Sequence, residues 1–240
     1  MNDFDPSTIR ALVFDVFGTV VDWRGTIVKE GAIWSAHSGV AVDWAGLADA
    51  WRAGYPVAMQ RAMKGEIAWG NIDALHRGIL DEIRPRFGLG ELPEAEVAHL
   101  NRVWHRLDPW PDSAAGLARL KTRYTISTLS NGNVALLVDM AKHAKLPWDC
   151  VLSAELFGKY KPDPAVYQGA ARLLDVAPHE LMMVAAHPSD LLAAQRAGLR
   201  TAHVARPLEW GAGGYREPLG DARFDVMADD FLDLAARLGA

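Results

Sequence analysis

The chain has 240 residues, of which 50% are hydrophobic and 23% are charged, as in an ordinary globular protein of one compact unit or two modest ones. Its net charge of -5 excludes the basic surface that nucleic-acid binding requires. No stretch approaches the roughly 20 apolar residues of a membrane helix, so we expect neither a nucleic-acid nor a membrane partner. The acidic start predicts no signal peptide, and the single cysteine, Cys150, cannot form an internal disulfide; both favour a reducing, cytoplasmic location.

Residues 9–15 predict the first strand, which ends in Asp15 and is followed by Gly18 and Thr19. An apolar run that ends in an aspartate is typical of a buried parallel strand with a carboxylate at its carboxyl edge. In open α/β sheets, ligands bind at that edge. The alternative is that Asp15 only caps the next helix.

From residue 22 to about residue 107 helical periodicity dominates. Leu47, Trp51, Tyr55 and Met59 recur at intervals of four, which places them on one face of a helix. We expect roughly four helices in this segment and no strand.

Strands and helices alternate again after Asp108. Strands are expected at 124–129, 151–152, 181–185 and 201–204, and helices at 114–121, 134–142, 164–174, 193–197 and 231–238. This alternation predicts an α/β fold with a doubly wound parallel sheet. We expect residues 1–20 and 109–240 to form this core, and residues 21–108 to form an inserted helical cap over the carboxyl edge of the sheet.

Four polar residues, Asp15, Ser130, Lys161 and Asp190, fall at or after predicted strand ends and should meet at one edge. With the helical insertion, they resemble the haloacid dehalogenase superfamily of hydrolases, and more closely its L-2-haloacid dehalogenases. The resemblance implies a Rossmann-like core and an aspartate that displaces halide from a 2-haloacid to form an ester, which water hydrolyses to a 2-hydroxy acid. It also implies that no metal or other cofactor is needed and that the chain forms a homodimer.

The resemblance assigns a role to each matching position. Asp15 matches the nucleophile, and Thr19 matches a hydroxyl beside it. Ser130 and Asn131 match the pair that holds the substrate carboxylate and the departing halide; a simple turn is the alternative. Lys161 matches the lysine that pairs with the nucleophile, and a nearby cation keeps a carboxylate ionised.

Two further positions match by spacing from that lysine. Tyr167 follows it by six residues and matches a substrate-binding position, although it could equally be a helix packing residue. Asp190 follows it by 29 residues and matches the acid that anchors the lysine or helps to activate water; its alternative role is a helix cap.

The cap should supply a cation for the leaving halide. Arg52 resembles the cap arginine of the family, because a guanidinium can stabilise developing negative charge. Arg24, Arg61 and Lys64 are its rivals. Candidates for the apolar wall of the site are Phe17, Trp51, Tyr55, Trp69 and Trp110, although ordinary core packing is the favoured alternative for each of them individually.

Phe17 distinguishes between two kinds of chemistry. Phosphate-cleaving relatives usually carry a second aspartate two residues after the nucleophile, which protonates the leaving oxygen. A phenylalanine cannot donate a proton, and a halide leaving group does not need one. Phe17 therefore favours cleavage of a carbon–halogen bond, and it weakens the case for magnesium, which prefers several oxygen ligands.

His187 departs from the family pattern. In the segment Val184–His187, an alanine and a histidine stand where we expect a serine and an asparagine before Asp190. His187 could position or deprotonate the hydrolytic water, or it could be structural. The site could also suit a small fluorinated acid such as fluoroacetate.

We therefore expect hydrolytic, metal-independent dehalogenation of short 2-haloalkanoic acids. A magnesium-dependent phosphatase of the same superfamily and a catalytically silent protein that binds small carboxylates are the alternatives.

Overall fold

The computed structural model describes residues 4–240. A six-stranded sheet with the order β5-β4-β1-β6-β7-β8 forms its centre, and every neighbouring pair is parallel. Its strands are β1 (Ala11–Phe14), β4 (Thr125–Ser130), β5 (Cys150–Ser153), β6 (Leu181–Ala185), β7 (Arg200–Val204) and β8 (Val226–Ala228). The strand order reverses at β1, so the predicted doubly wound parallel sheet is confirmed.

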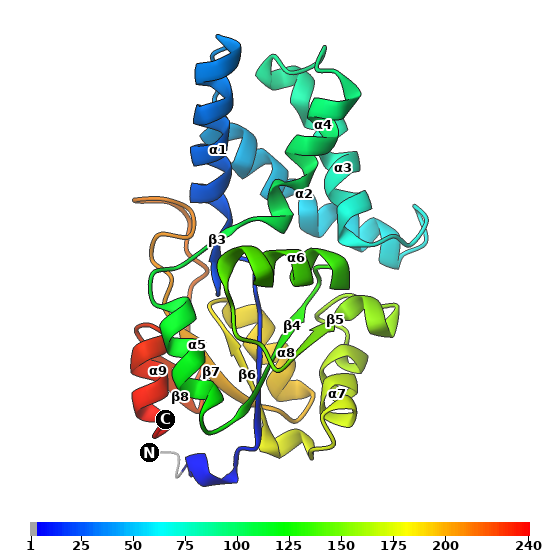
Figure 1. Ribbon diagram of the computed structural model, residues 1–240. Coiled ribbons are helices and arrows are strands. Elements are labelled where there is room, and N and C mark those ends of the chain that lie inside the picture. The colour runs from blue at the N-terminus through cyan, green and yellow to red at the C-terminus, as the bar shows by residue number, and fades with distance from the viewer. Residues whose placement is uncertain (1–3) are drawn as a thin grey trace.

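Both faces of this sheet are covered by helices (Figure 1). Along β1, Leu12 and Phe14 belong to one apolar cluster, and Ala11 and Val13 belong to the other, as the two-residue period of a strand requires. The first cluster includes residues of α5 (Ser113–Lys121), α6 (Val134–Ala144) and α9 (Phe231–Arg237), and the second includes residues of α7 (Pro164–Leu173) and α8 (Pro188–Arg196). Burial on both faces explains why the strands are almost continuously apolar.

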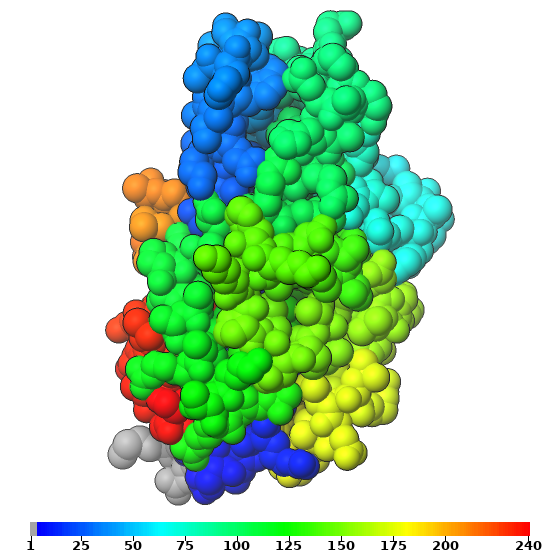
Figure 2. Space-filling view, in the orientation of Figure 1, coloured from blue at the N-terminus to red at the C-terminus, as the bar shows by residue number. Residues whose placement is uncertain are grey.

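The predicted helical segment lies over the carboxyl edge of the sheet. It contains α1 (Trp23–Ser38), α2 (Trp44–Met63), α3 (Ile72–Ile83) and α4 (Glu94–Asn101). Asp22, Asp43 and Asn71 cap the first three of these helices by accepting backbone N–H groups with their side chains. Figure 2 shows these helices packed directly above α6 on the viewed face.

A short ribbon connects the helical segment to the rest of the chain. Strands β2 (Val21–Asp22) and β3 (Asp108–Pro109) pair antiparallel, with Val21 opposite Pro109. We did not predict this ribbon, because two residues are too few to produce a strand period in the sequence. It brings the entry and the exit of the helical segment side by side.

Helix α8 begins earlier than predicted. The sequence indicated a helix over 193–197, but α8 starts at Pro188, directly after His187. Its first turn is polar, so apolar periodicity does not reveal it, although a proline at the first helical position is a favourable start. This start places Asp190 in the first turn, next to the carboxyl edge of β6. Among residues 4–240, no helix is both long enough and apolar enough to cross a membrane.

Candidate active site

Asp15 follows β1 between the ends of β4 and β6, where the strand order reverses. Its backbone N–H donates to the Val184 carbonyl of β6 at 3.0 Å. Its side chain is nearly buried and has three partners: Lys161 Nζ lies 3.0 Å from Oδ1, and Thr19 Oγ1 and His187 Nδ1 lie 2.8 and 3.0 Å from Oδ2. These contacts fix the carboxylate and leave no helix-capping role for it.

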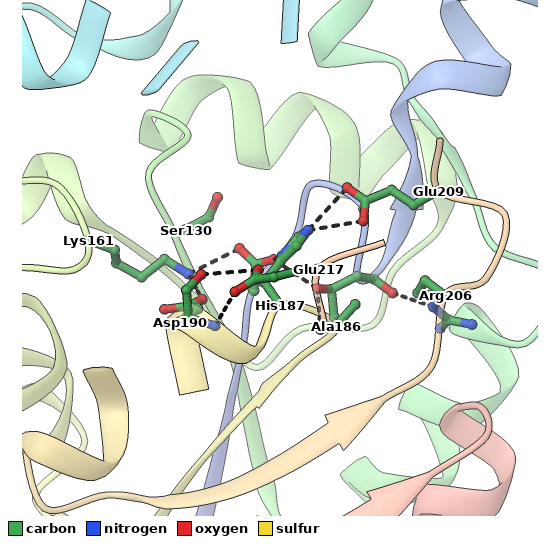
Figure 3. Close-up of polar contacts among 12 residues, drawn as sticks. Ser130, Lys161, Ala186, His187, Asp190, Arg206, Glu209 and Glu217 are labelled. Atoms are coloured by element: carbon green, nitrogen blue, oxygen red, sulfur yellow. Dashed lines mark hydrogen bonds and ion pairs between the residues drawn. The ribbon is translucent and has the colours of Figure 1, made fainter. Parts of the chain in front are cut away.

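Lys161 lies between two carboxylates. Its ammonium group is 3.0 Å from Asp15 Oδ1 and 2.5 Å from Asp190 Oδ2. Figure 3 labels Lys161 and Asp190. Its backbone N–H donates to Oδ1 of Asn131 at 2.7 Å, which ties the segment after β5 to the turn after β4. The two chain segments that carry Lys161 and Asn131 are thereby held against each other at the site.

Asp190 is bound through both of its oxygens. Oδ2 contacts Lys161, and Oδ1 accepts a 2.6 Å hydrogen bond from the Tyr167 hydroxyl. The side chain therefore anchors the lysine rather than capping α8. Tyr167, which is fully buried on α7, holds this acid in addition to lining the cavity.

His187 contacts Glu209, a residue of the site that was not predicted from the sequence. Its Nε2 lies 3.1 Å from both carboxylate oxygens of Glu209, on the segment after β7 (Figure 3). Glu209 Oε1 also accepts a 3.0 Å hydrogen bond from Trp23 Nε1, at the start of α1. A Cβ atom on Gly18, which has a φ of +85°, would lie 2.1 Å from the same oxygen, so only glycine leaves room for Glu209. The glycine at position 18, three residues after Asp15, was the one sequence feature that could have indicated this close approach.

The charges of these groups follow from their neighbours. Burial alone would raise the pKa of Asp15, but Lys161, His187 and Thr19 hold it well below its ordinary value. Burial would lower the pKa of His187, but its hydrogen bonds to Asp15 and Glu209 raise it to about 10. Asp15 is thus ionised and His187 carries a positive charge at neutral pH.

The outer two carboxyl groups differ from each other. Burial and the proximity of Asp15 raise the pKa of Asp190 despite its contact with Lys161. Burial opposes ionisation of Glu209 as well, but His187 lowers its pKa below the ordinary value. Burial likewise opposes the charged form of Lys161, and its two carboxylate partners overcome this and raise its pKa.

These side chains open into a cavity of about 660 Å³. Its lining includes Asp15, Phe17, Arg52, Ser130, Asn131, Lys161, Tyr167, His187 and Asp190, which are nine of the ten residues singled out from the sequence. The tenth, Thr19, lies behind Asp15 and is fully buried. Ser130 Oγ accepts the Gly132 N–H at 3.1 Å, so it stabilises the turn as well as lining the cavity.

Arg52 is the cap cation that reaches this cavity. Its guanidinium carbon lies 5.1 Å from the ring centre of Tyr55 and 5.8 Å from that of Trp23, on which it can rest by cation–π attraction. Of its rivals, Arg24 is paired with Asp49 at 2.7 Å, and Arg61 lies in a different hollow between α2 and α3.

The apolar wall differs from the prediction. Phe17 and Tyr55 line the cavity, but Trp51, Trp69 and Trp110 do not. Their indole rings have other positions: Trp51 donates to the His76 carbonyl, Trp110 donates to the Gly18 carbonyl, and Trp69 stacks on Tyr160. Trp210, next to Glu209, lines the cavity instead.

No group of three or more His, Cys, Asp or Glu side chains within residues 4–240 is arranged to hold a metal ion. The ammonium group of Lys161 fills the space between the Asp15 and Asp190 carboxylates. The arrangement holds an ionised carboxylate beside an open cavity whose lining also contains the guanidinium of Arg52 and the amide of Asn131.

Comparison with known proteins agrees with this geometry. Residues 9–198 match the family model of haloacid dehalogenase-like hydrolases. (S)-2-haloacid dehalogenase 1 of Pseudomonas sp. (strain CBS-3) is 32% identical over 204 residues, which are 82% of this chain and 85% of that protein.

Two crystal structures are similar over nearly the whole chain. The L-2-haloacid dehalogenase PA0810 is 47% identical with a TM-score of 0.92 and covers 96% of this chain and 99% of its own. The defluorinating L-2-haloacid dehalogenase Rha0230 is 42% identical with a TM-score of 0.92, and the match covers 97% of this chain and 96% of that one. The expected resemblance is confirmed: the chain belongs to the haloacid dehalogenase-like family of hydrolases.

Proposed function

We propose that this protein hydrolyses short 2-haloalkanoic acids to 2-hydroxy acids through an ester on Asp15, without a metal. The observation that carries the proposal is the setting of Asp15: a carboxylate kept ionised by Lys161, at a cavity whose wall beside it is Phe17 rather than a proton donor. An ionised carboxylate is the nucleophile that halide displacement needs.

In the first step, an oxygen of Asp15 attacks the carbon that bears the halogen, from the side opposite to the halogen. A carbon–oxygen bond forms, the carbon–halogen bond breaks, and the bonding electrons leave with the halide, which inverts that carbon. Arg52 and the amide of Asn131 lie in the same cavity and supply positive charge and a donor for the substrate carboxylate and the departing halide. No proton is needed, which agrees with Phe17.

In the second step, water attacks the carbonyl carbon of the ester. The bond between that carbon and the substrate oxygen breaks, the 2-hydroxy acid leaves, and Asp15 is regenerated. His187 is the group in position to take the water proton, because its Nδ1 faces Asp15 at 3.0 Å.

Fluoroacetate belongs among the proposed substrates. A similar structure is that of a defluorinating L-2-haloacid dehalogenase, and Arg52 supplies a cation in the cavity for the developing fluoride, which needs strong stabilisation. Residues 21–108 are proposed to act as the cap that closes the cavity, since Arg52 and Tyr55 of α2 form part of its lining. The homodimer and the cytoplasmic location stay predictions.

The test measures halide release from chloroacetate, fluoroacetate and both enantiomers of 2-chloropropionate in the presence of a chelator, with Asp15→Asn as the control. We expect release that survives the chelator and is abolished in the control. A single turnover in ¹⁸O-labelled water should place the label in the Asp15 carboxylate, because water attacks the enzyme carbonyl.

Two outcomes would overturn the proposal. Magnesium-dependent release of phosphate from phosphate esters, with no halide release, would identify a phosphatase. Binding of small carboxylates with neither halide release nor label in Asp15 would identify a silent binding protein.

A further inference from the structure

The acid–base groups of the site form one row in which the charges alternate. Asp190 contacts Lys161, Lys161 contacts Asp15, Asp15 contacts His187, and His187 contacts Glu209. The family resemblance explains the first three members of this row, but it assigns nothing to Glu209.

Glu209 is held rigidly in its place. It is 7% exposed, it accepts from Trp23 Nε1 at 3.0 Å, and Gly18 packs against its carboxylate. Trp23 is in turn fixed by Trp104, 6.3 Å away and stacked, and by Trp210, 5.0 Å away and edge-on. These contacts hold the carboxylate beside Nε2, where it provides a hydrogen-bond acceptor.

The two nitrogens of His187 therefore have unequal partners during the reaction. In the free enzyme both face carboxylates, Asp15 at 3.0 Å and Glu209 at 3.1 Å, and a ring between two anions holds a proton on each nitrogen. When Asp15 is converted to an ester it loses its negative charge, whereas Glu209 keeps its own. The other charged or titratable groups that act on this pair are Asp22 at the start of α1, His203 of β7 and Arg52 of α2.

Resting on the proposed function, we infer that Glu209 is a positioning residue that keeps the proton on Nε2 of His187, so that Nδ1 releases its proton when Asp15 becomes an ester and then takes one from the attacking water. The balance closes. Alkylation releases halide and the Nδ1 proton to solvent, and hydrolysis converts ester and water into Asp15 carboxylate, 2-hydroxy acid and protonated His187. His187 is thus an acid in the resting enzyme and becomes a base only after the ester has formed.

The first test reads the protonation of His187 directly. In the free wild-type enzyme labelled with ¹⁵N-histidine, we expect both nitrogens of His187 to be protonated at pH 8, with the signal assigned by its loss in His187→Asn. In Glu209→Gln the ring should be singly protonated at the same pH, while the exposed Glu82→Gln on α3 should match wild type. A neutral wild-type ring at pH 8 would overturn the inference.

The second test follows one turnover of chloroacetate with excess enzyme, recording proton release with an indicator dye and the Asp15 ester by mass. In wild type the proton should appear with the ester. In Glu209→Gln the proton should appear with the hydroxy acid, and hydrolysis should slow by about 100-fold, the lower end of what a positioned general base contributes. Trp23→Phe removes the N–H donor to Glu209. It should delay proton release and slow hydrolysis in the same direction as Glu209→Gln, and it replaces that variant if Glu209→Gln does not fold.

The failures of the two proposals differ. If no ester forms on Asp15, the proposed function fails. If the ester forms normally but the wild-type proton appears only with the hydroxy acid, the proposed function stands and the role of Glu209 is refuted.

Discussion

Replacing Lys161 with methionine tests the charge balance of the site most directly. The substitution keeps the length of the side chain but leaves the buried carboxylates of Asp15 and Asp190 without the ammonium group that lies 3.0 and 2.5 Å from them. Removing one partner of a buried ion pair destabilises a protein by about 3–5 kcal/mol, because the remaining charge is left uncompensated. Since Lys161 compensates two carboxylates, we expect a loss near the upper end of that range at pH 8.

The loss should depend on pH in a defined direction. Without the lysine, the two acids share a site and the pKa of at least one of them rises above its unfolded value. A group with a raised pKa in the folded state contributes stability below its unfolded pKa and loses it as the pH rises through the folded pKa. The Lys161→Met deficit should therefore shrink as the pH falls from 8 towards 5.

Urea unfolding followed by tryptophan fluorescence measures this deficit. Lys159→Met, two residues away and exposed, is the matched control, and adding Asp190→Asn to Lys161→Met should recover much of the loss at pH 8. A Lys161→Met protein that stays within about 1 kcal/mol of the control at pH 8, the range of an exposed ion pair, would refute the reasoning. So would a deficit that does not change with pH.

Other predictions concern neighbouring groups. Tyr167→Phe removes the 2.6 Å hydrogen bond to Asp190 and should lower the free energy of unfolding in urea by about 1.5–3 kcal/mol. An unchanged free energy of unfolding would show that water replaces this hydrogen bond to the Asp190 carboxyl group. Arg52→Leu should lower kcat for chloroacetate by about 100-fold with the fold intact by circular dichroism, as for the loss of one transition-state donor; an unchanged kcat would exclude it from halide stabilisation. His105 has both ring nitrogens 2.9 Å from aspartates, and although burial opposes its charge, those bonds raise its pKa. The stabilisation by charged His105 should be complete below about pH 6.5 and decline as the pH rises through its raised pKa. In urea unfolding, His105→Asn should therefore lower the free energy of unfolding by about 1 kcal/mol more at pH 6 than at pH 9. An equal loss at both pH values would contradict this prediction.

The catalytic edge was predictable because it depends on regular structure. The apolar runs before Asp15 and before His187 predict parallel strands, and the carboxyl ends of adjacent parallel strands must meet at one edge. Lys161 was found by its match to the family lysine and Asp190 by its spacing from it, and the structure brings both to Asp15. Helix periodicity also placed Trp51 on the apolar face of its helix, but it could not show that the indole packs in the core and does not line the cavity.

The remainder of the site depends on tertiary contacts that leave no periodic trace. Glu209 lies in the irregular segment after β7, shown in orange in Figure 1 beside the base of α1, and nothing in its local sequence marks it as functional. The aromatic wall was missed for a similar reason: Trp69 is 42% exposed and stacks on Tyr160, whereas Trp210 reaches the cavity only because its loop folds back. Composition shows that tryptophans are abundant, but only the folded chain shows which of them lies beside the site.

The departure at His187 and the presence of Glu209 explain each other. An amide at position 187 would carry no charge, so a buried acid at position 209 would face an uncharged neighbour, and an unpaired buried carboxylate is costly. A histidine at position 187 without the acid would have only Asp15 to hold its charge, and its ring could turn to present either nitrogen. With Glu209 fixed by Trp23, the ring has one orientation and Nδ1 is the nitrogen that faces the nucleophile. The histidine at one strand end thus pairs with a residue from a loop more than twenty positions later, and the proposed activation of water depends on both of them.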